Sequence, residues 1–170
     1  VSIFGLQFAR ALGGRVIVTS SHDEKLERAR QLGAEHLVNY RTDPRWDQTV
    51  WQWTGKRGVD HILEVGGGGT LEKSMQCIAA SGHIALIGVL TGFNAVPPSL
   101  FPLLARNVTM NGIYVGSRAD FQSMNAFIQH HQIHPIIDRV FDFREAPAAF
   151  QYLAEGSHFG KVVIAGPAEA

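Results

Sequence analysis

The feature that most constrains the fold of this chain is a regular alternation of short apolar runs with segments of helical periodicity. The runs have the length of β-strands, and in most of the segments between them apolar residues recur every three or four positions. Strands that alternate with helices form a mostly parallel sheet covered on both faces. We therefore expect an α/β fold of the doubly wound, Rossmann-like class. The runs are Val16–Thr19, His36–Tyr40, His61–Val65, His83–Val89, Val108–Val115 and Lys161–Ala165.

The start of the chain has the pattern of the second half of a strand–glycine loop–helix–strand unit. The amphipathic segment Ser2–Leu12 comes first, and the apolar run Val16–Thr19 follows it. In a complete unit, the first strand and the phosphate-binding glycines precede such a helix. We therefore expect residues 1–170 to be a partial dinucleotide-binding domain that lacks its first strand and its glycine-rich loop. By itself, such a piece is expected to be inactive.

Composition argues against several other kinds of protein. The 15 Lys and Arg residues balance the 15 Asp and Glu residues, so no basic field indicates a nucleic-acid or membrane partner. Cys77 is the single cysteine, which excludes an intramolecular disulfide and favours a reducing, cytoplasmic location. The histidines between His130 and His134 are interpreted as a solvated helix end and not as a metal site, because Pro135 disfavours helical geometry at His134.

Candidate binding residues follow the predicted strands, because ligands of a doubly wound sheet bind outside the carboxyl ends of its strands. Ser20 stands where an acid would bind the 2′-hydroxyl of NAD and repel a 2′-phosphate. Ser21 and Lys25 come next, and Tyr40 ends the following strand. Hydroxyl groups and cations suit a 2′-phosphate, so we predict NADP in preference to NAD. The alternative is that the serines cap a helix and that Lys25 is solvated.

A run of four glycines, Gly66–Gly69, follows the strand-like run His61–Val65. It does not match the dinucleotide-binding pattern G-x-G-x-x-G, because Leu71 stands at the position of the third glycine. Glycines at a strand end allow the backbone to approach another group closely, and we expect that group to be the cofactor. The alternative is a plain flexible turn.

Four segments carry a resemblance to a known family. In chain order they read VIVTSSHDEKLERARQLGAEHLVNYR, VDHILEVGGGGTLEKSMQCIAASGHIALIGV, NVTMNGIYVGSRADF and HPIIDRVFDFREAPAAFQYLAEGSHFGKVVI. Together they resemble the cofactor domain of the medium-chain dehydrogenase/reductase superfamily, near the zinc-type alcohol dehydrogenases and the quinone oxidoreductases. The resemblance covers nearly the whole chain.

The resemblance implies which residues contact the cofactor. Ser20, Ser21, Lys25 and Tyr40 match the pocket for the adenosine ribose and the 2′-phosphate. Val65 and Gly66 match the strand end beside the ribose and the pyrophosphate. The backbone stretches that hold the nicotinamide carboxamide are matched by Gly88, Val89 and Leu90 and by Val115, Gly116 and Ser117, and Lys161 matches a basic position near the cofactor. The family's zinc ligands and substrate pocket come mainly from an N-terminal GroES-like domain that this chain does not contain. We therefore assign no catalytic residue and no metal ligand, and whether the parent protein uses zinc stays open.

The leading functional hypothesis is an NADP-dependent oxidoreductase that transfers hydride between the nicotinamide and a small-molecule carbonyl, alcohol or activated alkene. In it, this chain binds and orients the cofactor. A second hypothesis is a nucleotide-sensing module that kept the fold and lost catalysis. An S-adenosylmethionine-dependent methyltransferase shares the alternation of strands and helices, but the four family-like segments argue against it.

The segment Asn107–Val115 predicts the mode of assembly. Its pattern is that of an apolar edge strand without proline, and such an edge pairs readily with another strand. In the resembling family this strand meets its symmetry mate across a twofold axis, which requires an antiparallel, self-complementary contact. We therefore expect a homodimer built through Asn107–Val115. The alternative is a monomer whose edge is covered by the loop Phe93–Pro102.

Overall fold

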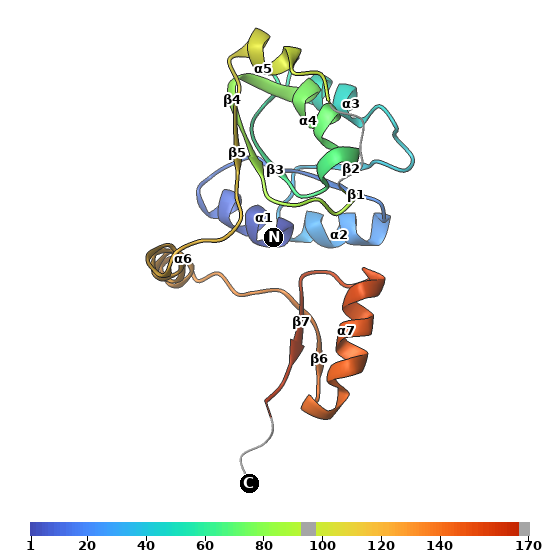
Figure 1. Ribbon diagram of the computed structural model, residues 1–170, viewed down its shortest axis with the longest axis vertical. Coiled ribbons are helices and arrows are strands. Elements are labelled where there is room, and N and C mark those ends of the chain that lie inside the picture. Colours follow the sequence, from blue (N-terminus) through green and yellow to red (C-terminus); the bar gives the residue numbers. More distant parts are fainter. Residues whose placement is uncertain (93–97, 167–170) are drawn as a thin grey trace. The chain divides into compact units, whose positions relative to one another are not determined.

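A computed structural model describes residues 1–92 and 98–166 (Figure 1). The chain divides into two compact units, Val1–Phe121 and Gln122–Ala170. Across the described residues, no helix combines the length and the apolar character needed to cross a membrane.

The first unit alternates helices and strands as the sequence predicts. All of its strand pairs are parallel, and they form a two-stranded sheet, β1–β2, and a three-stranded sheet ordered β3–β4–β5. The α/β prediction with parallel strands is thereby confirmed. In order, the elements are α1 (Ser2–Ala11), β1 (Ile17–Ser20), α2 (Asp23–Gln31), β2 (His36–Asn39), α3 (Trp46–Trp53), β3 (Val59–Glu64), the 3-10 turn η1 (Gly67–Gly69), α4 (Leu71–Cys77), β4 (Ile78–Leu86), α5 (Phe101–Arg106) and β5 (Thr109–Gly112). Helix α6 (Arg118–His130) follows and runs across the boundary between the units.

The core of the first unit forms where one face of the three-stranded sheet meets its helices. A cluster of buried side chains contains Met75 of α4 with Ile78 and Ile84 of β4, all fully buried. Leu103 of α5 and Met110 of β5 pack against this cluster. Figure 1 shows α4 and α5 beside these strands. Apolar burial on this scale holds the sheet and its helices as one body.

Strand register places the strand ends level with one another. In the two-stranded sheet, Ser20 lies opposite Asn39. In the three-stranded sheet, Glu64 lies opposite Leu86, and Leu86 lies opposite Gly112. Because the strands are parallel, all the carboxyl ends of a sheet lie on the same side. Residues that follow these strands therefore gather without being neighbours in sequence.

Three elements differ from the sequence prediction. Strand β4 begins at Ile78 and not at His83, because Ile78 and Ala79 are buried in the core after α4 has ended at Cys77. The expected loop Phe93–Pro102 runs into helix α5; its residues 93–97 lie outside the described residues. Strand β5 is shorter than the predicted run and ends at Gly112.

The second unit contains a strand that the sequence analysis missed. Strand β6 (Ile137–Phe141) pairs in parallel with β7 (Lys161–Ile164), and between them lie a 3-10 turn, η2 (Phe143–Glu145), and α7 (Ala146–Glu155). The charged pair Asp138–Arg139 interrupts the apolar run of β6, which hid it from a pattern search. The hydroxyl of Tyr152 donates to Asp138 at 2.7 Å and so fastens α7 to β6. This bond raises the pKa of Tyr152.

Cys77 lies in a second core cluster with Val38, Trp46 and Val50. Burial, with a smaller contribution from the charge of Asp47, raises the pKa of its thiol from 9.0 to about 12.

We predict that iodoacetamide does not label Cys77 in the folded protein at mildly alkaline pH and labels it rapidly in concentrated urea, because the thiolate is the reactive form. The stability that the protonated thiol contributes is complete below the unfolded pKa of 9.0 and is lost as the pH rises toward about 12. Mass spectrometry measures the labelling. Rapid labelling of Cys77 without denaturant would contradict its burial.

Candidate functional site

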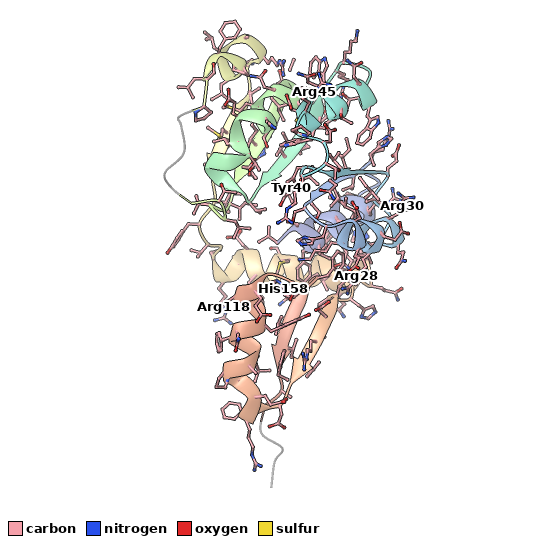
Figure 2. The ribbon with its side chains drawn as sticks, turned by 90° about the vertical axis from the view of Figure 1, so that its right-hand side faces the viewer. Arg28, Arg30, Tyr40, Arg45, Arg118 and His158 are labelled. Carbon is pink, nitrogen blue, oxygen red and sulfur yellow. The ribbon has the colours of Figure 1, made fainter. Side chains whose placement is uncertain are left out.

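The residues predicted to bind the adenosine end of the cofactor lie where β1 and β2 end and where α2 begins. The backbone N–H of Tyr40 donates to the carbonyl of Ser20 at 3.0 Å, which joins the two strand ends directly. Ser21 follows Ser20, and the half-buried Lys25 lies in the first turns of α2. The structure thus brings Tyr40 to Ser20, while Ser21 and Lys25 follow Ser20 along the chain. Tyr40 and Arg45 flank the turn that leads from β2 to α3 (Figure 2).

Helix α2 does not use the serines as side-chain caps. Its N-cap residue is His22, and no side chain accepts a capping hydrogen bond there. The hydroxyl oxygen of Ser20 accepts from the backbone N–H of His22 at 3.3 Å, and that of Ser21 lies 2.8 Å from Nδ1 of His22. The hydroxyl groups of both serines therefore stay at the strand end and do not cap the helix.

An additional residue, Asn39, fastens the two sides of this pocket. Its side-chain amide donates to the carboxylate of Asp23, the first residue of α2, at 2.7 Å. Its side-chain oxygen accepts from the backbone N–H of Arg41 at 3.0 Å. Asn39 thereby sets the end of β2 against the start of α2. The carboxylate of Asp23 is held toward β2 by this contact.

Glu64, the last residue of β3, is a buried acid at the candidate site. It is 4% exposed. One carboxylate oxygen accepts from the backbone N–H groups of Gly66 and Gly67, at 2.8 and 3.1 Å, and from the hydroxyl of Thr70 at 2.6 Å. The other oxygen accepts from the hydroxyl of Ser74 in α4 at 2.5 Å. A buried carboxylate needs such partners, and here its hydrogen bonds fix the conformation of the glycine run.

The glycine run is a packed turn and not a flexible one. Gly67 has a φ of +78°, and a Cβ on it would lie 2.8 Å from the Cα of Val89. A Cβ on Gly88 would lie 2.5 Å from the carbonyl oxygen of Val65. The close approach predicted for this run is therefore present, and the group approached is the chain's own segment after β4. Contact with a cofactor stays a prediction.

Hydrogen bonds join the segments that follow β3 and β4. Leu90 N–H donates to the carbonyl of Val65 at 3.2 Å. Thr91 N–H donates to the carbonyl of Gly66 at 2.9 Å, and the Thr91 hydroxyl donates to the same carbonyl at 2.7 Å. That hydroxyl also accepts from Gly69 N–H at 2.8 Å. Two predicted binding segments, Val65–Gly66 and Gly88–Leu90, are therefore held side by side.

The remaining predicted residues are less closely connected. Val115, Gly116 and Ser117 follow β5 and are exposed. Asp120 accepts from the backbone N–H and the hydroxyl of Ser117, at 2.7 and 2.8 Å, and these bonds lower the pKa of Asp120. Lys161 begins β7 and so belongs to the second unit.

Sequence reasoning missed Asn39, Glu64 and Thr91. The sequence carries a signal for one of them, since Glu64 is an acid within the strand-like run His61–Val65, two residues before the glycines. Asn39 and Thr91 carry none, because their roles depend on which strand ends the sheets bring together.

Metal binding has no support in the part of the chain that the structure describes. That part contains no group of three or more His, Cys, Asp or Glu side chains placed to hold a metal ion.

Comparison with known proteins identifies relatives along nearly the whole chain. Residues 1–130 match the sequence profile of the zinc-binding dehydrogenases. A zinc-type alcohol dehydrogenase-like protein from Schizosaccharomyces pombe is 42% identical over 167 residues, which are 96% of this chain and 48% of that protein. The chain thus spans about half the length of the curated relatives it matches.

Solved structures agree with this match. A crystal structure of a Sinorhizobium meliloti 1021 protein, assigned as an alcohol dehydrogenase, superposes with a TM-score of 0.90 at 43% identity, over 98% of this chain and 48% of that one. A crystal structure of an NAD-dependent alcohol dehydrogenase superposes with a TM-score of 0.89 at 29% identity, again over 98% and 48%. The Rossmann-like fold and the resemblance to medium-chain dehydrogenases and reductases are thereby confirmed.

The packing of the glycine turn yields a test. We predict that Gly67→Ala destabilises the protein by about 1–3 kcal/mol more than Gly13→Ala, measured as the free energy of unfolding in urea. The two glycines have nearly equal φ angles, +78° and +77°, so the backbone strain of an added Cβ is similar. Gly13 has no atom within 4 Å of that Cβ, whereas Gly67 meets the backbone of Val89. Equal losses would show that the turn is not packed.

Proposed function

Because this chain belongs to the zinc-binding dehydrogenase family, we propose that it is the cofactor-binding part of an NADP-dependent oxidoreductase. The observation that carries the proposal is the set of strand ends in the first unit, where hydroxyl groups, a cation and closely packed glycines gather at the carboxyl side of parallel strands. That is where open α/β sheets bind dinucleotides.

The adenosine end of the cofactor is assigned to Ser20, Ser21, Lys25 and Tyr40. The hydrogen bond between the backbones of Ser20 and Tyr40 supports a shared pocket. No acid stands at position 20, at the end of β1. A 2′-phosphate meets less repulsion beside Ser20 than it would beside a carboxylate at that position, which favours NADP over NAD. A similar structure is that of an NAD-dependent enzyme, so titration of both cofactors decides the point.

The rest of the cofactor is assigned to the segments after β3, β4 and β5. Val65 and Gly66 would contact the second ribose and the pyrophosphate, and Gly88–Leu90 with Val115–Ser117 would contact the nicotinamide carboxamide. The hydrogen bonds between the segments after β3 and β4 support this assignment, because they join the ends of these two neighbouring strands. Lys161 would supply a positive charge near the cofactor.

The chemistry of the whole protein is proposed as hydride transfer, which the nicotinamide supplies when bound. Its substrate class is a small carbonyl, alcohol or activated alkene. The contribution of this chain is to bind and orient the cofactor through backbone groups at fixed strand ends, and no proton donor is assigned to it. The buried free thiol of Cys77 accords with the cytoplasmic location that we propose.

Lys25 provides the test of cofactor choice. In the full-length protein we expect Lys25→Ala to weaken NADPH binding about tenfold, because a hydrogen bond to a charged group contributes roughly 1.5–3 kcal/mol. NADH, which lacks the 2′-phosphate, should bind almost as before. Fluorescence titration of both nucleotides measures the two dissociation constants.

The matched control is Lys56→Ala, since Lys56 is exposed in the turn after α3 and belongs to no proposed pocket. It should change neither dissociation constant. Equal losses for NADPH and NADH in Lys25→Ala would reject the 2′-phosphate pocket, and a wild type that binds neither nucleotide would reject the proposed function.

We also propose that the protein assembles as a homodimer through Asn107–Val115. Strand β5 ends the order β3–β4–β5, so one of its edges has no partner within that sheet. The ladder to β4 continues to Ile113, whose N–H donates to the carbonyl of Leu86 at 2.9 Å. Beyond it, Tyr114 and Val115 are 97% and 78% exposed. An exposed apolar edge of this kind fits antiparallel pairing with a second copy.

Tyr114→Pro tests this interface. Backbone N–H groups alternate in direction along a strand, so the N–H of Tyr114 points away from β4 if that of Ile113 points toward it. Proline removes this outward donor, and we expect it to convert a dimer into a monomer. Tyr114→Ala keeps the N–H and should keep the dimer. Light scattering distinguishes the states; a monomeric wild type, or a proline variant that stays dimeric, would place the interface elsewhere.

A further inference from the structure

The segments that follow β3 and β4 are joined by one side chain that no part of the proposed function uses. Thr91 comes directly after Gly88–Leu90, and its hydroxyl donates to the carbonyl of Gly66 at 2.7 Å and accepts from Gly69 N–H at 2.8 Å. One hydroxyl therefore spans the glycine turn from its first residue to its last.

The glycine turn is held from its other side by Glu64. The carboxylate of Glu64 accepts from the N–H groups of Gly66 and Gly67, and the side chain is 4% exposed. Between Glu64 on the buried side and Thr91 on the exposed side, three of the four glycine N–H groups have a side-chain acceptor. The turn has no side chain of its own with which to resist movement, so these acceptors fix it.

The glycine turn and the segment after β4 are closely packed against each other. A Cβ on Gly69 would lie 2.9 Å from the hydroxyl oxygen of Thr91, and a Cβ on Gly67 would meet Val89. The carbonyl of Gly66 accepts from both the N–H and the hydroxyl of Thr91. A shift of either segment would therefore break bonds in the other.

We propose that Thr91 is a positioning residue that couples the Gly66–Gly69 turn to the Gly88–Leu90 segment, so that the two hold the ribose, pyrophosphate and nicotinamide portion of the cofactor as one rigid cradle. The inference rests on the proposed function, because it takes from there which segments meet the cofactor. Thr91 acts through those segments and needs no contact with the cofactor. Its effect is confined to the half of the dinucleotide that NADP and NAD share.

The test removes the hydroxyl of Thr91 and keeps the shape of the side chain. In the full-length protein, Thr91→Val removes both side-chain hydrogen bonds and keeps the backbone bond to Gly66. We expect the dissociation constants of NADPH and NADH to rise by the same factor, about tenfold, as the loss of two hydrogen bonds implies. Binding of 2′,5′-ADP, which contains only the adenosine end, should change less than about twofold. If the wild type prefers NADH, AMP replaces 2′,5′-ADP as the probe of that end. Thr91→Ser restores the hydroxyl and should restore dinucleotide binding.

Thr54→Val is the matched control. The Thr54 hydroxyl also donates to a carbonyl, that of Trp51, and accepts from a glycine N–H, that of Gly58, both at 2.9 Å. It lies in the turn between α3 and β3, at the amino end of that strand. This variant should lower the stability of the protein to urea and leave all nucleotide dissociation constants unchanged.

Three results would overturn the role of Thr91 and leave the proposed function standing: unchanged dinucleotide binding by Thr91→Val, an equal loss of affinity for the adenosine-end probe, or no recovery of binding in Thr91→Ser. An equal loss would show a general structural role instead of positioning. A wild type that binds neither NADPH nor NADH would remove the proposed function and this inference with it.

Discussion

The candidate site depends on the buried carboxylate of Glu64. It lies at the end of β3, and all of its donors among the described residues are neutral backbone or hydroxyl groups. Leaving one such buried donor without a partner costs about 1–3 kcal/mol, so four of them bind the turn, α4 and β3 into one arrangement. The glycine turn, which has no side chains, takes its shape from this carboxylate.

Parallel pairing of the strands brings residues that are distant in the sequence together at the candidate site. The end of each strand is separated from the next by a helix or a long connection, yet register aligns Ser20 with Asn39 and Glu64 with Leu86. Polar residues after these strands then face the same side. The two sheets of the first unit thereby supply two kinds of surface, with hydroxyl groups and a lysine after β1 and β2 and packed glycine backbone after β3 and β4.

The two kinds of surface divide the task that we propose for them. Charge and hydroxyl groups can discriminate a 2′-phosphate from a 2′-hydroxyl, because that difference is one of charge. The glycine segments cannot discriminate in this way, since they offer only backbone groups, but they allow close approach to the part that NADP and NAD share. Affinity and choice between cofactors are therefore expected to depend on residues at the strand ends of two different sheets.

The sequence alone determined the class of fold and the approximate positions of most strands. The spacing of apolar residues is a local property, and it was enough to locate β1, β2, β3 and β7 and most of the helices. It failed at β6, where Asp138 and Arg139 interrupt the apolar run, and at the start of β4, where Ile78 leaves a helical pattern to enter the core. Only the tertiary structure decided that Asn39, Glu64 and Thr91 connect the binding segments. Each joins groups that different strands bring together, and such contacts depend on strand order and register, which no local pattern contains.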